Sequence, residues 1–363
     1  MRIKQEIYMQ KALTLARKGN GKTSPNPKVG AVIIMGNRVI ASDYHKKSGS
    51  PHAEILALRK AGTMARGATI FINLEPCCHT NKKTPPCTGA IIKSGIRKVV
   101  VAMIDPNPKV AGKGLKELRR AGIETETGLM ENEAEKLNES FIKFITKKKP
   151  FITLKIAQSL DGKIATAGGE SKWITGIKAR RFVHQLRNDT DAVLVGIGTV
   201  IKDNPSLDCR IKGGINPYRI VVDSDLRIPL RSKVLKYSDG KTIIATTSKA
   251  GSRKTALLRS SGHTVLIIKD NKGRVDLKRL VKELAKLDIT SVMIEGGSSI
   301  NASALSSGIV DKVIFFCAPK IIGGLDAIPS VGGISPSSLS KILRLKDLHV
   351  EKVGDDFLFE GYI

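Results

Sequence analysis

One histidine and two cysteines of this 363-residue chain have the types and the spacing of a catalytic zinc site. His52 and Glu54 belong to the motif PHAE at 51–54. Cys77 and Cys87 are the first and last residues of the segment CCHTNKKTPPC. A catalytic zinc ion takes three nitrogen or sulfur ligands and keeps a fourth position for water, whose pKa falls to about 7. We therefore predict that His52, Cys77 and Cys87 bind zinc. Glu54, which is not a ligand, would pass protons to a ring nitrogen and a departing amine.

The order of these motifs is typical of zinc nucleobase deaminases, whose signature joins HxE to PCxxC. The second half is stretched in this chain, because Cys87 follows Cys77 by ten positions. Two alternatives stay open: a structural zinc ion with a fourth ligand from Cys78 or His79, and iron in place of zinc. A structural site needs no carboxylate beside it, so Glu54 favours the catalytic interpretation.

Two α/β domains are expected to position these groups. From residue 1 to 146, short β-branched runs such as KVGAVIIM and ATIFINL alternate with helical stretches, which predicts a three-layer domain. Its first helix would turn Ile7, Leu13 and Ala16 towards the core, and the proline of PHAE suits the start of a later helix. The charge run TKKKP predicts a linker at 147–150.

After the linker the alternation restarts, which predicts a second α/β domain over 151–363. Its strongest feature is SVMIEGGSSINASAL, a β-run followed by a Gly-Gly turn and a helix of small residues. Backbone amides at a helix N-terminus bind anions, so this turn could hold a cofactor phosphate. An ordinary strand-turn-helix connection has the same pattern, so the motif alone does not decide between the two.

Charge and composition narrow the classes of function. The 61 Lys and Arg against 33 Asp and Glu give a net charge of +28, which attracts nucleic acid or a phosphorylated small substrate. The positive charge is spread along the chain and aromatic residues make up only 4%, so base-stacking platforms are scarce. No run of about 18 apolar residues occurs, so we expect no membrane-spanning segment. Five cysteines, three of them clustered, favour metal binding in a reducing cytoplasm over disulfides.

Two unrelated sets of motifs resemble one family, the bifunctional riboflavin-biosynthesis deaminase/reductases. The first half is similar in TSPNPKVG, YHKKSGSPHAE, LEPCCHTNKKTPPC and DPNPKVAGKG. The second half is similar in LKIAQSLDGKIAT, ESKWITG, LRNDTDAVLVGIGTVIKDNPSLDCR, VVDSDLRIP and IEGGSSINASAL. The resemblance covers nearly the whole chain. It implies a cytidine-deaminase-like three-layer α/β domain followed by a dihydrofolate-reductase-like α/β domain.

The resemblance also implies two successive reactions. The family uses zinc to hydrolyse the 2-amino group of 2,5-diamino-6-(5-phosphoribosylamino)pyrimidin-4(3H)-one. It then uses NADPH to reduce the ribosyl group of 5-amino-6-(5-phosphoribosylamino)uracil to ribityl. The expected partner is this phosphorylated pyrimidine and not nucleic acid, and we expect a cytoplasmic homo-oligomer. A nucleic-acid editing deaminase is the main alternative, favoured by the charge but not by a second domain with reductase motifs. A binding protein with an inactive metal site would lack Glu54 or a ligand, and all are present.

The resemblance further implies the residues of each site, beside zinc at His52, Cys77 and Cys87 and proton transfer at Glu54. The deaminase substrate would contact Asn26, His45, Lys83, Asp105 and Asn107. NADPH would contact Ala157, Trp173, Thr199, Asp203, Gly297, Ser298, Ser299, Ile300, Asn301, Ala302 and Ser303. The reductase substrate would contact Ser171, Arg187, Leu207, Arg210 and Glu295.

Three groups of the second site carry specific chemical expectations. Arg187 and Arg210 offer bidentate donors that suit a phosphate, although without the motifs surface ion pairs would be the better explanation. Lys155 and Glu295 are our candidates for proton transfer while hydride is delivered to the sugar C1′. Trp173, the single tryptophan, either covers the cofactor or fills a core.

Overall fold

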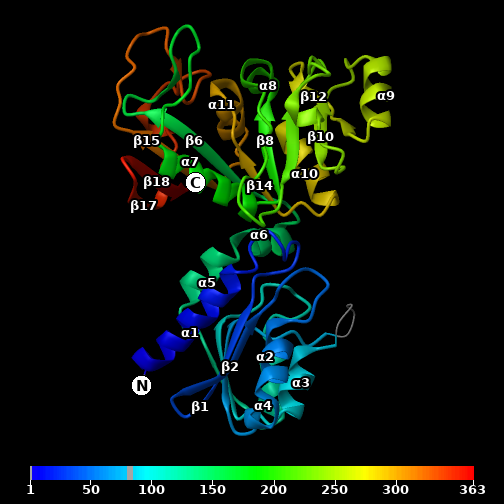
Figure 1. Ribbon diagram of the computed structural model, residues 1–363, viewed down its shortest axis with the longest axis vertical. Coiled ribbons are helices and arrows are strands. Elements are labelled where there is room, and N and C mark those ends of the chain that lie inside the picture. The colour runs from blue at the N-terminus through cyan, green and yellow to red at the C-terminus, as the bar shows by residue number, and fades with distance from the viewer. Residues whose placement is uncertain (1, 80–84) are drawn as a thin grey trace. The chain divides into compact units, whose positions relative to one another are not determined.

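The chain forms two compact units, Met1–Lys148 and Lys149–Ile363. The computed structural model describes residues 2–79 and 85–363 (Figure 1). The boundary between the units falls where helix α6 (Glu139–Lys147) ends and before strand β6 begins at Phe151. Each unit buries hydrophobic clusters of its own residues. No helix in the described ranges is long and apolar enough to cross a membrane.

The first unit is built on a five-stranded sheet of order β2-β1-β3-β4-β5. Its strands are β1 (Gly30–Met35), β2 (Arg38–Tyr44), β3 (Thr69–Leu74), β4 (Lys98–Met103) and β5 (Glu124–Thr127). Strand β1 is antiparallel to both of its neighbours, whereas β3, β4 and β5 are parallel. The carboxyl ends of β3 and β4 therefore meet at one edge of the sheet, where loops can bring side chains together.

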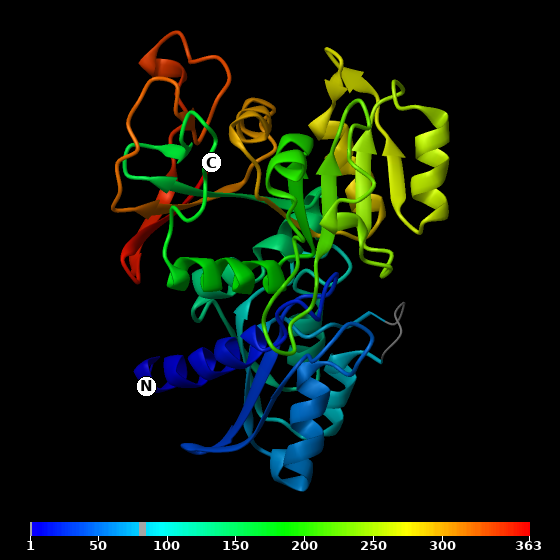
Figure 2. The ribbon, with the colours of Figure 1, turned by 45° about the horizontal axis from the view of Figure 1, so that its top comes forward.

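Helices cover both faces of this sheet, which confirms the predicted three layers (Figures 1 and 2). The helices are α1 (Arg2–Arg17), α2 (Ala53–Ala61), α3 (Cys87–Lys93), α4 (Lys113–Arg120) and α5 (Glu131–Leu137), with a 3₁₀ turn η1 (Gly62–Ala65). Helices α1 and α5 lie on one face, and α2, α3 and α4 lie on the other.

Helix α1 corrects one detail of the predicted core. Leu13 and Ala16 are fully buried, as expected, but Ile7 is 62% exposed. The buried positions are Met9, Ala12, Leu13 and Ala16, which recur at the three- and four-residue spacing of one helical face. Ile7 lies on the opposite side of the helix from this stripe, so the prediction for Ile7 was wrong.

The second unit is built on a nine-stranded sheet of order β11-β10-β9-β8-β14-β6-β15-β18-β17. Its strands are β6 (Phe151–Ser159), β8 (Ala192–Gly196), β9 (Tyr218–Val222), β10 (Thr242–Thr246), β11 (Thr264–Ile267), β14 (Ser291–Ile294), β15 (Lys312–Ala318), β17 (Lys346–Val353) and β18 (Asp356–Tyr362). The first seven strands of this order, from β11 to β15, are parallel to one another. Strand β18 is antiparallel to β15, and the edge strand β17 is antiparallel to β18. Two small ribbons pair β7 (Lys163–Ala165) with β16 (Ile328–Pro329), and β12 (Asp270–Asn271) with β13 (Arg274–Val275).

Helices pack on both faces of the large sheet as well. They are α7 (Ile177–Asp189), α8 (Ile197–Asp203), α9 (Ser252–Ser260), α10 (Leu277–Lys286) and α11 (Ser298–Ser306), with short 3₁₀ turns η2 (Lys233–Leu235) and η3 (Leu339–Lys341). Leu186 of α7 and Leu258 of α9 join one hydrophobic cluster, whereas Leu280 of α10 and Ala304 of α11 join the cluster on the other face. Parallel strands place their carboxyl ends at a common edge, where ligands of such sheets bind. The predicted α/β class is thus confirmed for both units.

Candidate active sites

The first site lies where α2, α3 and the loop after β3 meet. His52 directly precedes α2, Cys87 begins α3, and Cys77 lies in the loop that follows β3. His52 Nδ1 is 3.3 Å from Cys87 Sγ and 3.5 Å from Cys77 Sγ. The three ligand atoms all lie within 4.8 Å of one another. One imidazole nitrogen and two sulfurs at these separations fit a single zinc ion with bonds of about 2.0–2.3 Å.

Backbone hydrogen bonds explain how the stretched motif still brings its two cysteines together. The carbonyl oxygen of Cys77 accepts the N–H of Cys87 at 3.0 Å and that of Thr88 at 3.3 Å. The start of α3 is therefore bound to the backbone of Cys77, the residue that carries the first thiol. Cys78 and His79, the alternative ligands, do not belong to the group of three that the described residues form.

Glu54 lies in the first turn of α2 and is 3% exposed. Its Oε2 atom is buried and accepts no hydrogen bond within the described part of the chain. Burial raises the pKa of Glu54, and the neighbouring Cys77 acts in the same direction. The carboxyl group of Glu54 thus lies beside the three candidate metal-binding atoms and does not belong to that group.

His45 and Asn26 are brought to the same place. His45 Nδ1 lies 3.2 Å from the carbonyl oxygen of Pro51, and because a carbonyl only accepts, Nδ1 carries the proton. Nε2 of this ring then accepts from Asn26 Nδ2 at 3.4 Å. Burial lowers the pKa of His45, which is consistent with a neutral ring. The ring also meets that of His52 edge-on, with centroids 5.4 Å apart.

The other expected substrate contacts of this site follow β4. Asp105 is 6% exposed, and its Oδ1 accepts the N–H of Asn107 at 2.8 Å. Asn107 in turn accepts the N–H of Lys109 through its side chain. Lys83, which the resemblance also implies, lies outside the described residues.

The second site is centred on three charged residues that contact one another, Lys155, Arg187 and Glu295. The sequence did not indicate that Arg187 contacts Glu295. Glu295 follows β14, and its side chain is only 7% exposed. It accepts Arg187 Nε at 2.7 Å and Arg187 Nη2 at 3.0 Å, and its Oε2 lies 3.0 Å from Lys155 Nζ. Burial by itself raises the pKa of Glu295, but the charges of Lys155 and Arg187 outweigh burial and lower it to about 2. Glu295 is therefore a carboxylate at neutral pH.

The two arginines predicted to suit a phosphate differ in their surroundings. The bidentate face of Arg187 is engaged by Glu295, and Arg187 Nη1 donates to the carbonyl oxygen of Asp208 at 3.1 Å. Arg210 is exposed, and its Nε donates to the Asp208 carboxylate at 3.2 Å. Leu207 is buried just before this pair with a φ of 55°.

Seven of the expected cofactor residues, Gly297 to Ser303, form the N-cap and the first turns of α11. Gly297 occupies its N-cap, and a Cβ there would lie 3.7 Å from Thr199 Oγ1 of α8. A Cβ on Gly196 would lie 3.5 Å from Ile300, so the VGIGTV and GGSSIN motifs are adjacent. The buried Asn301 anchors this helix by donating to the carbonyl oxygen of Ser330 at 2.8 Å. The remaining expected residues continue along these elements: Ser298, Ser299, Ala302 and Ser303 on α11, Asp203 on α8, and Ala157 on β6.

Trp173 does not fill a core. Its side chain is 65% exposed, and the Arg180 guanidinium carbon lies 4.4 Å from the ring centroid. Its carbonyl oxygen accepts Lys320 Nζ at 3.0 Å. Of the two interpretations of this residue, the structural one is therefore wrong. Ser171, two residues earlier, is half-buried in the same segment.

Two residues at these sites were not identified from the sequence. His184 lies one turn before Arg187 on α7, and burial followed by the charges of Arg187 and Arg210 lowers its pKa. The spacing of three from Arg187 was the available signal for His184. Glu75 accepts four backbone N–H groups beside the first site. Only its place in LEPCC could have indicated Glu75.

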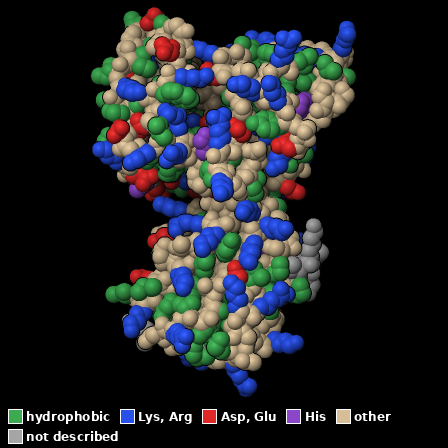
Figure 3. All heavy atoms as spheres, in the orientation of Figure 1, with side chains coloured by type: hydrophobic (Ala, Val, Ile, Leu, Met, Phe, Trp, Pro, Cys, Tyr) green, Lys and Arg blue, Asp and Glu red, His purple; other side chains and the backbone are tan. Residues whose placement is uncertain are grey.

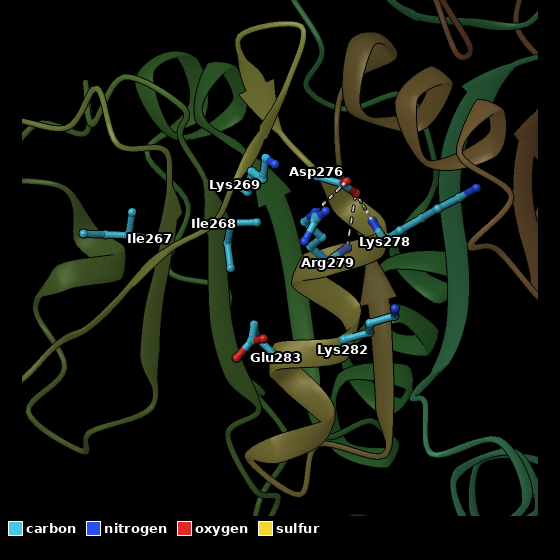
Figure 4. Close-up of a pocket in the computed structure, with 8 residues that line it drawn as sticks. All are labelled: Ile267, Ile268, Lys269, Asp276, Lys278, Arg279, Lys282 and Glu283. Carbon is cyan, nitrogen blue, oxygen red and sulfur yellow. Dashed lines mark hydrogen bonds and ion pairs between the residues drawn. The ribbon is translucent and has the colours of Figure 1, made fainter.

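A groove of about 350 Å³ opens elsewhere in the second unit, between the end of β11 and α10 (Figure 4). It is lined by Ile267, Ile268, Lys269, Asp276, Lys278, Arg279, Lys282 and Glu283. Asp276 accepts the N–H of Lys278 and of Arg279, so it acts as the N-cap of α10. None of these eight residues belongs to the expected substrate or cofactor contacts, and we assign the groove no part in either site.

Comparisons with known proteins match both halves of the chain. The family model of the cytidine and deoxycytidylate deaminase zinc-binding region matches residues 2–103, and that of the RibD C-terminal domain matches residues 150–359. The riboflavin biosynthesis protein RibD of Aquifex aeolicus is 46% identical over 97% of this chain and 96% of its own length. That of Escherichia coli is 38% identical over 98% of both chains.

Solved structures agree over the whole length. RibD of Acinetobacter baumannii has a TM-score of 0.90 at 38% identity and covers 100% of this chain and 99% of its own. A diaminohydroxyphosphoribosylaminopyrimidine deaminase/5-amino-6-(5-phosphoribosylamino)uracil reductase from Thermotoga maritima has a TM-score of 0.88 at 38% identity, covering 99% of both chains. These findings confirm the predicted deaminase and reductase folds, with zinc and NADPH as cofactors. The chain belongs to the RibD family of bifunctional deaminase/reductases of riboflavin biosynthesis.

Proposed function

We propose that the first unit hydrolyses the 2-amino group of 2,5-diamino-6-(5-phosphoribosylamino)pyrimidin-4(3H)-one. The second unit then reduces the ribosyl group of the resulting 5-amino-6-(5-phosphoribosylamino)uracil to ribityl. The observation that carries the proposal is the group of His52, Cys77 and Cys87 with the buried Glu54 beside it. The Thermotoga maritima relative, described by these two activities, supports the choice of substrates.

In the first site we assign zinc binding to His52, Cys77 and Cys87. When bound, zinc supplies a polarised water that is nucleophilic near neutral pH. Glu54 would transfer two protons in turn, both of which come from the attacking water: the first goes to the ring nitrogen, and the second goes to the amino group, so that the C–N bond breaks and ammonia leaves. Its buried Oε2, which accepts no hydrogen bond from the described residues, is the atom available for this transfer.

The substrate would be held by groups from the loops around the proposed zinc ligands. We propose that Asn26 and the neutral His45 contact the pyrimidine, since their side chains already meet beside His52. Asp105 and Asn107 would contact it from the loop after β4. Lys83 stays a proposed contact to the phosphoribosyl part, on the resemblance alone.

In the second site we divide the chemistry between Lys155 and Glu295. NADPH supplies the hydride to C1′ of the ring-opened sugar. Glu295, with its pKa lowered to about 2, cannot donate a proton at neutral pH. We therefore assign proton donation to the Lys155 ammonium, and to Glu295 the orientation of that ammonium through the 3.0 Å contact.

We propose that NADPH lies against the start of α11 and α8. Gly297 to Ile300 offer backbone N–H donors at the N-terminus of α11, whereas Asn301, Ala302 and Ser303 would make contact through their side chains. Thr199 and Asp203 lie on the facing helix α8. Ala157 and the exposed ring of Trp173 would complete the contacts. The substrate would lie beside Ser171, Leu207 and Arg210, with Arg187 acting on it through Glu295.

We further propose a small-molecule substrate and not nucleic acid. Lys and Arg side chains are scattered over the visible face of the molecule and do not follow a single stripe (Figure 3). Aromatic residues at 4% leave few platforms on which bases could stack. The net charge of +28 is then spread over the surface and does not mark a binding site for nucleic acid.

The chain is proposed to form a homo-oligomer in the cytoplasm. In the edge strand β17 seven of eight residues are exposed, including Leu348 at 56% and Val350 at 48%. Leu348 and Val350, exposed on this edge strand between charged side chains, support a second copy as its partner. The thiols of Cys77 and Cys87 must stay reduced to bind zinc, which favours a reducing compartment. The mass in solution by light scattering tests the first statement, and cell fractionation tests the second.

The decisive experiment measures zinc content and follows ammonia release from the diaminopyrimidinone with and without NADPH. About one zinc per chain, ammonia without NADPH, and NADPH oxidation only after deamination would support both assignments and their order. Ammonia from single-stranded RNA or DNA, with no NADPH oxidation on the pyrimidine substrate, would replace them with the editing alternative.

A further inference from the structure

Glu75 is a buried carboxylate for which the reaction has no direct use. It follows β3 and is 2% exposed. Its Oε2 accepts the N–H of Asp105 at 3.2 Å and of Gly112 at 2.8 Å. Its Oε1 accepts the N–H of Gly114 at 2.9 Å and of Leu115 at 3.2 Å. Four N–H donors around two oxygens thus make Glu75 a hydrogen-bond acceptor at both oxygens.

Three of these donors belong to the start of α4. Gly112 is the N-cap of α4, and it has no side chain with which to cap the helix. The first N–H groups of a helix lack partners within the helix, and a negative charge near them is stabilising. Glu75 therefore caps α4 from a loop 37 positions earlier in the chain.

The start of α4 is also in close contact with the metal-binding loop. A Cβ on Gly114 would lie 2.2 Å from the carbonyl oxygen of Pro76, so only glycine fits there. Pro76 is the residue between Glu75 and Cys77. The start of α4 and the peptide that leads into the first metal-binding thiol thus pack as one block.

The fourth donor connects Glu75 with the expected substrate contacts. The N–H of Asp105 donates to Glu75, and the side chain of Asp105 accepts the N–H of Asn107. Two successive hydrogen bonds therefore link the residue next to the metal-binding loop with Asn107. The roles of Asp105 and Asn107 are part of the proposed function, and the inference rests on it.

We propose that Glu75 is a positioning residue of the deaminase site, which holds segment 105–107 at a set distance from Cys77. It does not touch the reacting atoms. Its carboxylate fixes the segment and the start of α4 against the metal-binding loop, so that the pyrimidine contacts and the zinc ligands face one another. Without it, the zinc ligands would still assemble, because the hydrogen bond from the N–H of Cys87 to the carbonyl oxygen of Cys77 does not involve Glu75.

The test is Glu75→Gln in the full-length protein. The amide has nearly the same size, and its oxygen can accept one pair of N–H groups, but its NH₂ group then faces the other pair. We expect KM for the diaminopyrimidinone to rise by about 10- to 100-fold, with a much smaller change in kcat. Zinc should stay at one per chain, and the reductase activity of the same chain should be unchanged, which serves as an internal control.

Leu118→Ala is the matched control for stability. Leu118 lies on α4, is fully buried in the hydrophobic core, and makes no contact with Glu75 among the hydrogen bonds above. The truncation should lower the melting temperature at least as much as Glu75→Gln, yet leave KM unchanged. If both variants lose stability and both raise KM alike, Glu75 is only a structural residue and the proposal is overturned.

Asn107→Ala separates the inference from the proposed function. A raised KM in Asn107→Ala together with an unchanged KM in Glu75→Gln would overturn the positioning role alone. An unchanged KM in Asn107→Ala would remove the proposed substrate contact and the inference with it. Loss of zinc from Glu75→Gln would also contradict the proposal, because the carboxylate would then support the metal ligands and not segment 105–107.

Discussion

The two active sites of this chain are held together by different interactions. The proposed deaminase site rests on backbone hydrogen bonds, such as those that Cys87 and Thr88 donate to the carbonyl oxygen of Cys77. The reductase site rests on charged side chains, with Glu295 between Arg187 and Lys155. The candidate zinc ligands of the first site lie within 35 positions of one another, from His52 to Cys87, whereas Arg187 and Glu295 are 108 positions apart. The first kind of site is visible in local motifs, and the second requires the assembled sheet.

The largest expected effect comes from removing one of the proposed zinc ligands of the first site. Cys77→Ala removes one of three ligands, so we expect loss of zinc and of all measurable deaminase activity, with reductase activity retained. Cys78→Ala is the matched control, since its thiol is outside the group of three. Metal analysis of both variants decides the ligand set. Zinc lost from the Cys78 variant and kept in the Cys77 variant would reverse our choice.

Glu54→Gln tests the same site without disturbing its ligands. The amide cannot carry the proton to the leaving amine, so kcat for ammonia release should fall by about 10²- to 10⁴-fold. Zinc content should stay at that of the unmodified chain. Reduction of 5-amino-6-(5-phosphoribosylamino)uracil, supplied directly, should not change. A deaminase rate close to that of the unmodified chain would mean that another group transfers the proton.

Lys155→Met breaks the second site in the corresponding way. It removes the proposed proton donor and leaves Glu295 with Arg187 as its remaining cation, so reductase kcat should fall by about 10²-fold or more. Arg187→Lys keeps the charge but loses the bidentate contact, and its effect should be smaller. Ammonia release should be unaffected in both. An Arg187 variant more impaired than the Lys155 variant would shift the proton-donor assignment away from Lys155.

The ion triad also predicts how stability depends on pH. The folded state lowers the pKa of Glu295 from 4.5 to about 2, so its stabilising contribution is fully present above about pH 4.5. That contribution is lost as the pH falls from about 4.5 towards 2, where the carboxylate takes up a proton. Unfolding curves of the protein and of Glu295→Gln across this range should therefore converge at the acidic end. Parallel curves would indicate that the triad does not hold Glu295 ionised.

The smallest effect concerns the cofactor end of the second site. Trp173 is the single tryptophan and its ring is 65% exposed, so its fluorescence reports on this place alone. We expect NADPH to quench it on binding, without any change on addition of zinc. Fluorescence unchanged at NADPH concentrations that support turnover would exclude contact between this ring and the cofactor.

Sequence and structure agree to different degrees for the two sites. His52, Glu54, Cys77 and Cys87 were identified together because each belongs to a short motif whose spacing follows from metal chemistry. Glu75 stood inside one of those motifs, yet its function depends on donors from a loop and a helix that only the folded chain brings near. Ile7 was placed in the core because it is apolar, although at nine residues from Ala16 it lies on the opposite side of α1, so helical periodicity could have excluded it.

The sequence by itself determined the two α/β domains and their order, and it predicted the proposed zinc ligands and the proton carrier beside them, because these depend on local periodicity and on ligands near one another along the chain. The tertiary structure decided that Arg187 engages Glu295, that Glu295 is ionised and flanked by Lys155, and that Glu75 caps α4. Such pairings depend on strand order and on burial, which set the distance between charges and the cost of leaving them unpaired.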